Sequence, residues 1–448
     1  MQNLLNILAI SPDPAGGFKP YMILLPFALI LFFSKLFAIV LKKIKVPQVI
    51  GYLVAGILLG AITLIPNQPI FTTSVMEGIN DFAKIGVIII MFSAGLGTDI
   101  KKIKETGKSA LVITSLGVIF PLIFGFGVAM GFLNTLVFTP TGFSITGLFS
   151  CLFYGVLLTA TSVSVTVTVL KELGKLDSKV GACLISAAVL DDIIGIILLS
   201  LIVSLSKTGT GDSGLPFGID FGIDWVNIVV LIIFMVGFFA ICFLLWKPIN
   251  KLFSWLNKKW PNHRRIPVFG FALAFLLAWA AEYCFGVADI TGAFMAGLLI
   301  SETGSRDYID SKADSEAGII FGPIFFASIG MMLFTTPITF NSEFWEYSMF
   351  GIAFVIVGLL GKVVGAGLGG LITKFNLKDS AKLGVGMMAR AEVLIVCAKK
   401  GIDENMIDPR IMFFILLLII LSSILTPIIL KLLYKKEIEE EKLLINHP

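Results

Sequence analysis

The stretch AAVLDDIIGIILLSLI, residues 187–202, decides the fold class of this chain. It is apolar except for Asp191 and Asp192, and it lies within the longer apolar segment 178–206. A hydrophobic run of about 20 residues is long enough to cross the core of a bilayer as a helix. Charges inside a membrane are costly and usually face the protein interior at functional sites. The stretch therefore predicts a membrane-spanning helix that carries two functional carboxylates.

The composition of the whole chain predicts a polytopic helical membrane protein. Of its 448 residues, 57% are hydrophobic and 14% are charged, and the mean hydropathy is +0.96. Soluble domains carry about 25% charged residues. The apolar runs are continuous and do not alternate, which excludes a transmembrane β-barrel. The net charge of +4 resides in loops and does not indicate a nucleic-acid partner, and the five cysteines lie in apolar segments without metal or disulfide spacing.

Thirteen hydrophobic segments are predicted to span the membrane. They lie at residues 21–41, 47–64, 82–99, 108–131, 146–170, 178–206, 225–246, 266–286, 289–302, 316–334, 345–374, 381–400 and 411–432. Most of the 34 Lys and Arg residues fall in alternate loops, including KKIK (42–45), the 247–265 loop and the stretch from Lys374 to Lys382. Because cytoplasmic loops carry the excess of positive charge, we expect an extracellular N-terminus and a cytoplasmic C-terminus in the cell membrane.

An odd number of crossings fits two six-helix repeats of inverted topology joined by a linker helix. We expect an extracellular segment at 1–20, the first repeat at 21–206, the linker helix at 225–246 and the second repeat at 266–434. Together they make one membrane domain, 21–434. The remaining residues, 435–448, form a cytoplasmic tail that is too short to be a regulatory domain.

Polar residues interrupt the fifth segment of each predicted repeat. TATS (159–162) lies within the first of these segments, and GVGMMARAE (384–392) lies within the second. Transporters built from inverted repeats often have interrupted helices at matching positions, where the freed backbone groups bind ions. The two interruptions therefore predict a transporter.

Further charged residues lie inside the predicted membrane segments. Lys362 is deep in the eleventh segment, and three others are Glu282, Arg390 and Glu392. One of the two aspartates is expected to pair with Lys362, which leaves the other as an exchangeable site. A desolvated carboxylate can bind either a proton or, with backbone carbonyls and Thr hydroxyls, a dehydrated cation. Competition between the two at one site is the minimum requirement for antiport.

At these residues the sequence resembles the monovalent cation:proton antiporter-2 family, and in particular its two-aspartate Na⁺/H⁺ antiporters of the NapA and GerN type. The similarity centres on the segment from TATSVSVTV to DDIIGIILLS (159–200). It extends in the same order to VPQVIGYLVAGILLG (46–60), GVIIIMFSAGLGTDI (86–100), DITGAFMAGLLIS (289–301), FFASIGMML (325–333) and GKVVGAGLGG…GVGMMARAEV (361–393). The resemblance implies an all-α, NhaA/NapA-like fold with two crossed, partly unwound helices beside a dimerisation domain.

The resemblance also implies roles for single residues. Asp192 matches the essential carboxylate that binds Na⁺ or a proton, with Asp191 and Thr161 as further ligands. Lys362 matches the lysine that pairs with Asp191. Thr159, Thr161 and Ser162 fall in the first unwound segment. Arg390 and Glu392 match the charged pair after the second unwound segment. Glu282 is expected to be a further supporting charge because of its position deep in the eighth segment, not because of the resemblance.

The predicted function is Na⁺(Li⁺)/H⁺ antiport that is electrogenic and proceeds by an elevator-like alternating-access movement. A K⁺/H⁺ or mixed Na⁺/H⁺-K⁺ antiporter is the alternative. We expect a homodimer without cofactor, and no regulatory nucleotide-binding domain in this chain. An intramembrane enzyme fits poorly, because DDIIG lacks the third acid of a DDxxD magnesium site and no GxGD motif supplies a protease partner. A channel fits poorly, because channels build charged rings from several subunits.

Overall fold

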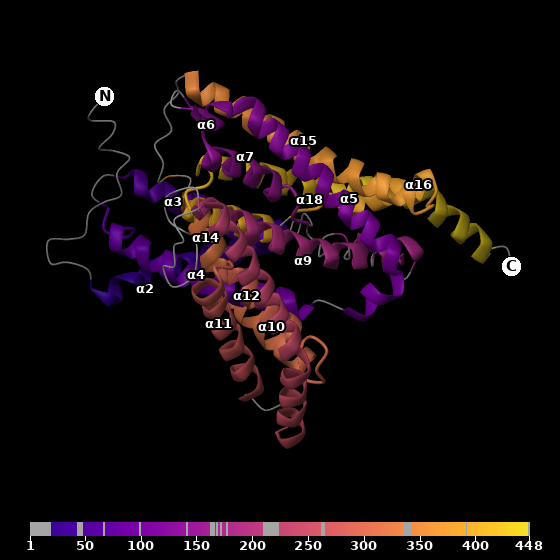
Figure 1. Ribbon diagram of the computed structural model, residues 1–448, viewed down its shortest axis with the longest axis horizontal. Coiled ribbons are helices and arrows are strands. Elements are labelled where there is room, and N and C mark those ends of the chain that lie inside the picture. The colour runs from indigo at the N-terminus through magenta and orange to yellow at the C-terminus, as the bar shows by residue number, and fades with distance from the viewer. Residues whose placement is uncertain are drawn as a thin grey trace. The chain divides into compact units, whose positions relative to one another are not determined.

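Helices form nearly all of the regular structure in the computed structural model of this protein (Figure 1). The structure describes residues 19–446 apart from 43–47, 66–67, 98–99, 140–141, 162–165, 167–168, 171–172, 176–177, 209–223, 261–264, 333, 335–341 and 391. Among these described residues, strand structure is limited to one short antiparallel hairpin, formed by β1 (Phe138–Thr139) and β2 (Gly142–Phe143).

The chain divides into two compact units, and each unit combines one stretch from the first half of the chain with one from the second. Unit 1 contains Met1–Thr98 and Lys207–Thr339, whereas unit 2 contains Asp99–Ser206 and Phe340–Pro448. The predicted repeats group the chain differently, since each repeat contributes to both units. The division into repeats stays a prediction.

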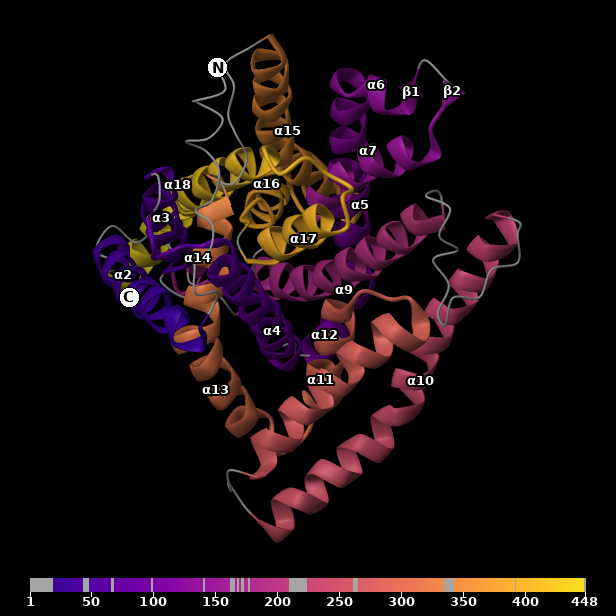
Figure 2. The ribbon, with the colours of Figure 1, turned by 90° about the vertical axis from the view of Figure 1, so that its left-hand side faces the viewer.

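Unit 1 is held together by helix pairs that approach closely at glycines. Its helices are η1 (Pro20–Ile23), α2 (Leu24–Lys42), α3 (Gln48–Gly60), η2 (Ala61–Leu64), α4 (Thr73–Gly97), α10 (Asp224–Lys259), α11 (Arg265–Phe285), α12 (Asp289–Ile300), α13 (Arg306–Glu316), η4 (Ala317–Phe321) and α14 (Gly322–Met332). A Cβ atom on Gly95 of α4 would lie 2.2 Å from the Phe294 carbonyl of α12. Helices in membranes pack through such small residues. Figure 2 shows α10 beside α11 and α12.

Unit 2 contains the helix pair with the most extensive contact, α5 (Ile100–Phe132) and α15 (Ser342–Ile372). Its other helices are α6 (Asn134–Val137), α7 (Ile145–Leu157), most of α9 (Lys179–Thr208), α16 (Leu377–Gly386), α17 (Glu392–Asp403) and α18 (Ile411–Asn446). Glycines again allow the close approach: a Cβ atom on Gly365 of α15 would lie 2.3 Å from the Leu116 carbonyl of α5. Lys362 lies on α15, one turn before Gly365.

Eight helices among the described residues are long and apolar enough to cross a membrane. Three shorter apolar helices lie at Gln48–Leu64, Ile145–Leu157 and Asp289–Ile300. The predicted helical membrane class is thereby confirmed. Each of the thirteen predicted segments overlaps a helix of the structure, but the number of crossings, their orientation and the inverted repeats stay predictions.

Candidate functional site

The first interruption follows α7, which ends at Leu157, in unit 2. The chain from Leu158 to Thr161 is not helical. Thr159 is buried, and its hydroxyl donates to the Val156 carbonyl at 2.7 Å. Thr161 is buried too, and its hydroxyl interacts with the Asp191 carboxylate. Ser162, the third residue predicted here, lies outside the described residues.

The second interruption separates α16 from α17, also in unit 2. The helix α16 ends at Gly386, and α17 begins at Glu392. The Arg390 side chain links this segment to the first interruption. The Arg390 guanidinium donates to the Ala160 carbonyl at 2.5 Å, and the Thr166 hydroxyl donates to the Gly386 carbonyl at 2.6 Å. Interrupted helices leave carbonyl groups without intrahelical donors, and the side chains of Arg390 and Thr166 supply donors to two of them.

The two aspartates lie on α9, in the same unit as the two interruptions. Lys362 of α15 donates to Asp191 Oδ1 at 2.5 Å, and both side chains are fully buried. The other carboxylate oxygen of Asp191, Oδ2, is buried as well. Burial of an ion pair is unfavourable unless its remaining polar atoms find partners, and the Thr161 hydroxyl supplies one such interaction to the Asp191 carboxylate.

Asp192 has surroundings that differ from those of its neighbour. Adjacent residues of a helix point about 100° apart, and Asp192 is only half-buried. It interacts electrostatically with Lys362 and with the thiol of Cys397 on α17. Cys397 did not emerge as a site residue from the sequence, where it is one of five cysteines in apolar segments. Only the fold brings α17 beside this part of α9.

Arg390 is the largest fully buried side chain of the structure's described part. Besides Ala160, its guanidinium donates to the Gly358 carbonyl at 2.8 Å, one helical turn before Lys362 on α15. Its main-chain N–H donates to the Ser422 hydroxyl of α18 at 3.2 Å. Arg390 also interacts electrostatically with Asp191. This residue therefore ties both interruptions to the helix that carries Lys362.

Two other predicted residues do not join this group in the described structure. Glu392 is the first residue of α17, but its side chain lies outside what the structure describes. Glu282 lies on α11 of unit 1, where its side chain is exposed, whereas the aspartates and Lys362 belong to unit 2. A supporting role for either residue stays a prediction.

The serines of α18 and Thr166 were not predicted from the sequence. Ser422 accepts from Arg390, and the Ser423 hydroxyl donates to the Arg390 carbonyl at 3.4 Å. A signal was available, because LSSILT (421–426) is a polar cluster within an apolar segment. Thr166 lies in a run of alternating Val and Thr, in which nothing distinguishes it from its neighbours.

The donor atoms gathered in unit 2 are mainly oxygens. Two carboxylates, the Thr161 hydroxyl and the main chain of two interruptions lie on adjoining elements. Unwound backbone and carboxylates are the ligands with which transporters bind Na⁺ or protons. Within the described ranges no cluster of three or more His, Cys, Asp or Glu could hold a metal ion. The arrangement therefore supplies oxygen ligands of the kind that bind a cation.

Comparisons with known proteins agree with this chemistry. The family model described as "Sodium/hydrogen exchanger, transmembrane" matches residues 28–436. The chain is 33% identical over 384 residues to the probable Na⁺/H⁺ antiporter GerT of Bacillus cereus, with 84% of this chain and 90% of that protein covered. It is 32% identical over 388 residues to the Na⁺/H⁺-K⁺ antiporter GerN of the same organism, with 85% and 88% covered.

A solved structure has a similar fold. The sodium proton antiporter MjNhaP1 of Methanocaldococcus jannaschii matches with a TM-score of 0.66 over 93% of this chain and 97% of that chain, at 19% identity. At this identity the likeness shows the fold alone. The family match and the relatives confirm the resemblance found in the sequence, and the chain belongs to the transmembrane sodium/hydrogen exchanger family.

Proposed function

We propose that the protein exchanges Na⁺, or Li⁺, for protons across the membrane, with Asp192 and Asp191 as the groups that bind either ion. The family to which the chain belongs contains cation/proton antiporters, which are transporters and not enzymes. The observation that carries the proposal is the fully buried ion pair between Lys362 and Asp191, with Asp192 adjacent on α9. Such intramembrane charges usually mark ion pathways and proton relays.

Charge balance explains why protons and cations would compete. The four groups Asp191, Asp192, Lys362 and Arg390 sum to zero when all are ionised. A Na⁺ ion bound to Asp192 adds one positive charge in a buried site, and the release of a proton removes one. Asp191 Oδ2 and the Thr161 hydroxyl are both buried, the hydroxyl interacts with the Asp191 carboxylate, and both would serve as further ligands of the cation. Asp191 would then divide its oxygens between Lys362 and the cargo.

Electrogenic exchange follows if two protons move for each Na⁺. One net charge then crosses in each cycle, and a membrane potential contributes about 2.3 kcal/mol per 100 mV. Lys362 is the candidate for the second proton carrier, because it can release its proton when Asp191 turns to the cargo. The two-aspartate pattern and the buried lysine support this stoichiometry.

Alternating access in this proposal is an elevator-like movement of one unit against the other. All described members of the ion site lie in unit 2, which supports transport by movement of that unit as a body. A homodimer in the cell membrane, with the N-terminus outside and the C-terminus in the cytoplasm, completes the proposal. The charge bias of the loops supports the orientation.

Potassium is the alternative cargo. The relative GerN, 32% identical to this chain, is named as a Na⁺/H⁺-K⁺ antiporter. A K⁺/H⁺ or mixed Na⁺/H⁺-K⁺ exchanger would use the same aspartates, because both ions are bound by oxygen ligands. The choice between the cargoes therefore depends on the transport assay.

The test is cation-dependent proton movement in proteoliposomes that contain the purified chain. Na⁺, Li⁺ and K⁺ are compared as saturating series, with a pH-sensitive dye inside the vesicles. We expect saturable exchange with Na⁺ and Li⁺ that accelerates under an imposed potential of the appropriate sign. Exchange with K⁺ alone would favour the alternative, a rate indifferent to potential would remove electrogenicity, and no exchange with any cation would contradict the proposed function.

A further inference from the structure

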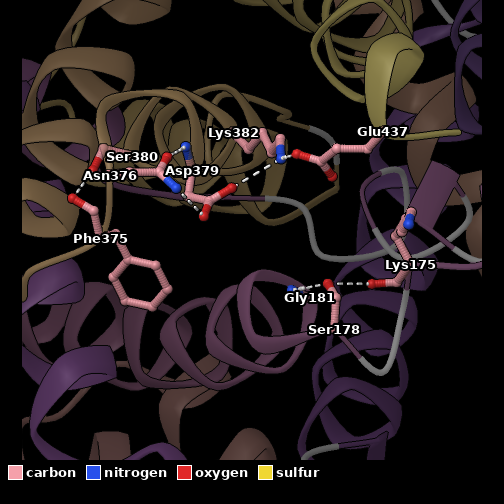
Figure 3. A network of polar contacts seen from close by, with 9 residues as sticks. All are labelled: Lys175, Ser178, Gly181, Phe375, Asn376, Asp379, Ser380, Lys382 and Glu437. Atoms are coloured by element: carbon pink, nitrogen blue, oxygen red, sulfur yellow. Dashed lines mark hydrogen bonds and ion pairs between the residues drawn. The ribbon is translucent and has the colours of Figure 1, made fainter. Parts of the chain in front are cut away.

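A second buried lysine, Lys382, lies on α16 away from the ion pair of Lys362. Its side chain is 1% exposed. The ammonium group donates to Asp379 Oδ1 at 2.9 Å and to a carboxylate oxygen of Glu437 (Figure 3). It also lies 4.3 Å from the centre of the Tyr434 ring, a cation–π contact. Lys382 is thus surrounded by two carboxylates and an aromatic face.

Glu437 comes from the part of α18 that follows the candidate membrane span Ile411–Lys435. The same helix also contacts the interruption between α16 and α17, because Ser422 and Ser423 bind the main chain of Arg390. The C-terminal helix therefore contacts this segment at two places, near the middle of α16 and at the interruption. A helix that only crosses the membrane would need neither the Lys382–Glu437 ion pair nor the contacts of Ser422 and Ser423.

The helix α16 connects this cluster to the ion pair of Lys362. Gly384 lies two residues after Lys382, and a Cβ atom at Gly384 would lie 2.4 Å from the Val363 carbonyl. Val363 directly follows Lys362 on α15. A shift of α16 toward α15 would therefore displace the backbone beside Lys362, and a shift away would loosen it. The contacts form a continuous series from Glu437 to the Asp191–Lys362 pair.

The start of α9, the helix that carries Asp191, is fixed in the same region. Ser178 caps this helix, with its hydroxyl accepting from the Gly181 N–H at 3.1 Å (Figure 3). The next residue, Lys179, lies 4.9 Å from the centre of the Phe375 ring, just before α16 begins. Both helices that supply the buried ion pair are thus adjacent to α16, which Glu437 holds through Lys382.

We propose that Glu437 is a positioning residue for the ion site, and that the segment of α18 around it is a latch that holds α16 against the helix of Lys362. The inference rests on the proposed function, since the positioned group is the cation-binding pair. Glu437 is 42% exposed at its side chain and Asp379 26%, so solvent reaches the outer side of the latch while its lysine is buried. Loss of Glu437 loosens α16 and changes the affinity for the transported cation.

The experiment uses the full chain with Glu437→Gln, and Glu346→Gln as the matched control. Glu346 is an exposed glutamate at the start of α15 in the same unit. Two quantities are measured: hydrogen–deuterium exchange of the peptides covering α16, and KM and Vmax for Na⁺ in proteoliposomes. Glu437→Gln should increase exchange over α16 and raise KM by about two- to thirtyfold, the range known for mutations that alter coupling at a distance. Vmax should change little, and Glu346→Gln should change neither quantity.

A double-mutant cycle with Lys382→Met separates the latch from a general loss of stability. If Glu437 acts through Lys382, adding Glu437→Gln to Lys382→Met should produce no further change in KM. Unchanged deuterium exchange in Glu437→Gln would overturn the latch, and increased exchange with an unchanged KM would overturn the positioning role. Failure of the unmodified chain to exchange any cation would instead contradict the proposed function, so the two failures are distinguishable.

Discussion

Lys362 and Lys382 are both buried in unit 2, but their ammonium groups meet different partners. Lys362 donates to one carboxylate, Asp191, which is itself fully buried. Lys382 donates to two carboxylates, Asp379 and Glu437, which remain partly exposed. The first lysine is enclosed together with its counter-ion, whereas the second is enclosed alone and solvent reaches its partners.

The difference indicates separate roles. Around Lys362 any change of charge must be offset by another ion, because water cannot screen a fully buried group. That property couples a proton to a cation. Around Lys382 two carboxylates share one ammonium group, and Glu437 is the one that comes from another helix, so this contact attaches α18 to α16. The first cluster is suited to exchange and the second to attachment.

The largest expected effect concerns the aspartate beside the Lys362 pair. Asp192→Asn keeps the shape of the side chain but removes the charge that would bind Na⁺ or a proton, so exchange should fall to the level of empty liposomes. Asp379→Asn is the matched change beside the other lysine, and it should retain cation exchange because Glu437 still binds Lys382. The measurement is Na⁺-dependent proton movement in proteoliposomes. Wild-type exchange by Asp192→Asn would remove the ion-binding role of this residue.

Replacement of Lys362 should destabilise the protein more than replacement of Lys382. Lys362→Met leaves Asp191 buried without its partner, and removal of one partner of a buried ion pair costs about 3–5 kcal/mol. Lys382→Met leaves two carboxylates that solvent can reach, and we expect a loss nearer about 1 kcal/mol, as for partly exposed ion pairs. Thermal unfolding of the purified variants in detergent, followed by circular dichroism, measures the difference.

A rescue experiment provides the control for this comparison. Adding Asp191→Asn to Lys362→Met removes the uncompensated charge and should restore much of the lost stability. Adding Asp379→Asn to Lys382→Met should restore little stability, because the carboxylates beside Lys382 are partly exposed and solvent can reach them. Equal losses from the two single lysine variants would show that the burial of the partners does not distinguish the two clusters.

The sequence predicted the first cluster but not the second. Two adjacent aspartates and a lysine inside apolar segments are conspicuous, because charges are costly there. Lys382 lies at the edge of an apolar segment, where a lysine resembles an ordinary charge of a cytoplasmic loop. It binds Glu437, which is 55 residues away in the tail that is predicted to be too short for a regulatory domain. Periodicity and spacing do not reveal a partner at that distance.

The positions of the two interruptions could be predicted from the sequence, but their hydrogen bonds could not. TATS and GVGMMARAE indicated where the helices break, since polar clusters in apolar runs are visible in the sequence. They did not indicate that the Arg390 guanidinium donates to the Ala160 carbonyl. A main-chain acceptor leaves no trace in the residue type, and Ala160 has the least informative side chain of its neighbours. The grouping of the chain into two units also depends on contacts between distant segments.

The smallest expected effect tests how the helix of Lys362 is held, in contrast to the ion pairs that hold α16. Gly365→Ala places a Cβ atom 2.3 Å from the Leu116 carbonyl, so α15 must move away from α5. Overpacking of this kind costs about 1–3 kcal/mol. Gly367→Ala on the same helix is the control, because its Cβ atom would meet Ser380 at an ordinary 3.6 Å.

Both substitutions replace a helical glycine by alanine, so both gain the same intrinsic helix propensity, about 1 kcal/mol. The difference between the two variants therefore isolates the contact with Leu116. We expect Gly365→Ala to be less stable than Gly367→Ala and to have a higher KM for Na⁺, because Lys362 lies one turn away on the displaced helix. If the two variants unfold at the same temperature and transport alike, the close approach of α15 to α5 does not position Lys362. The fixed distance between Lys362 and Asp191 would then depend on the ion pair itself.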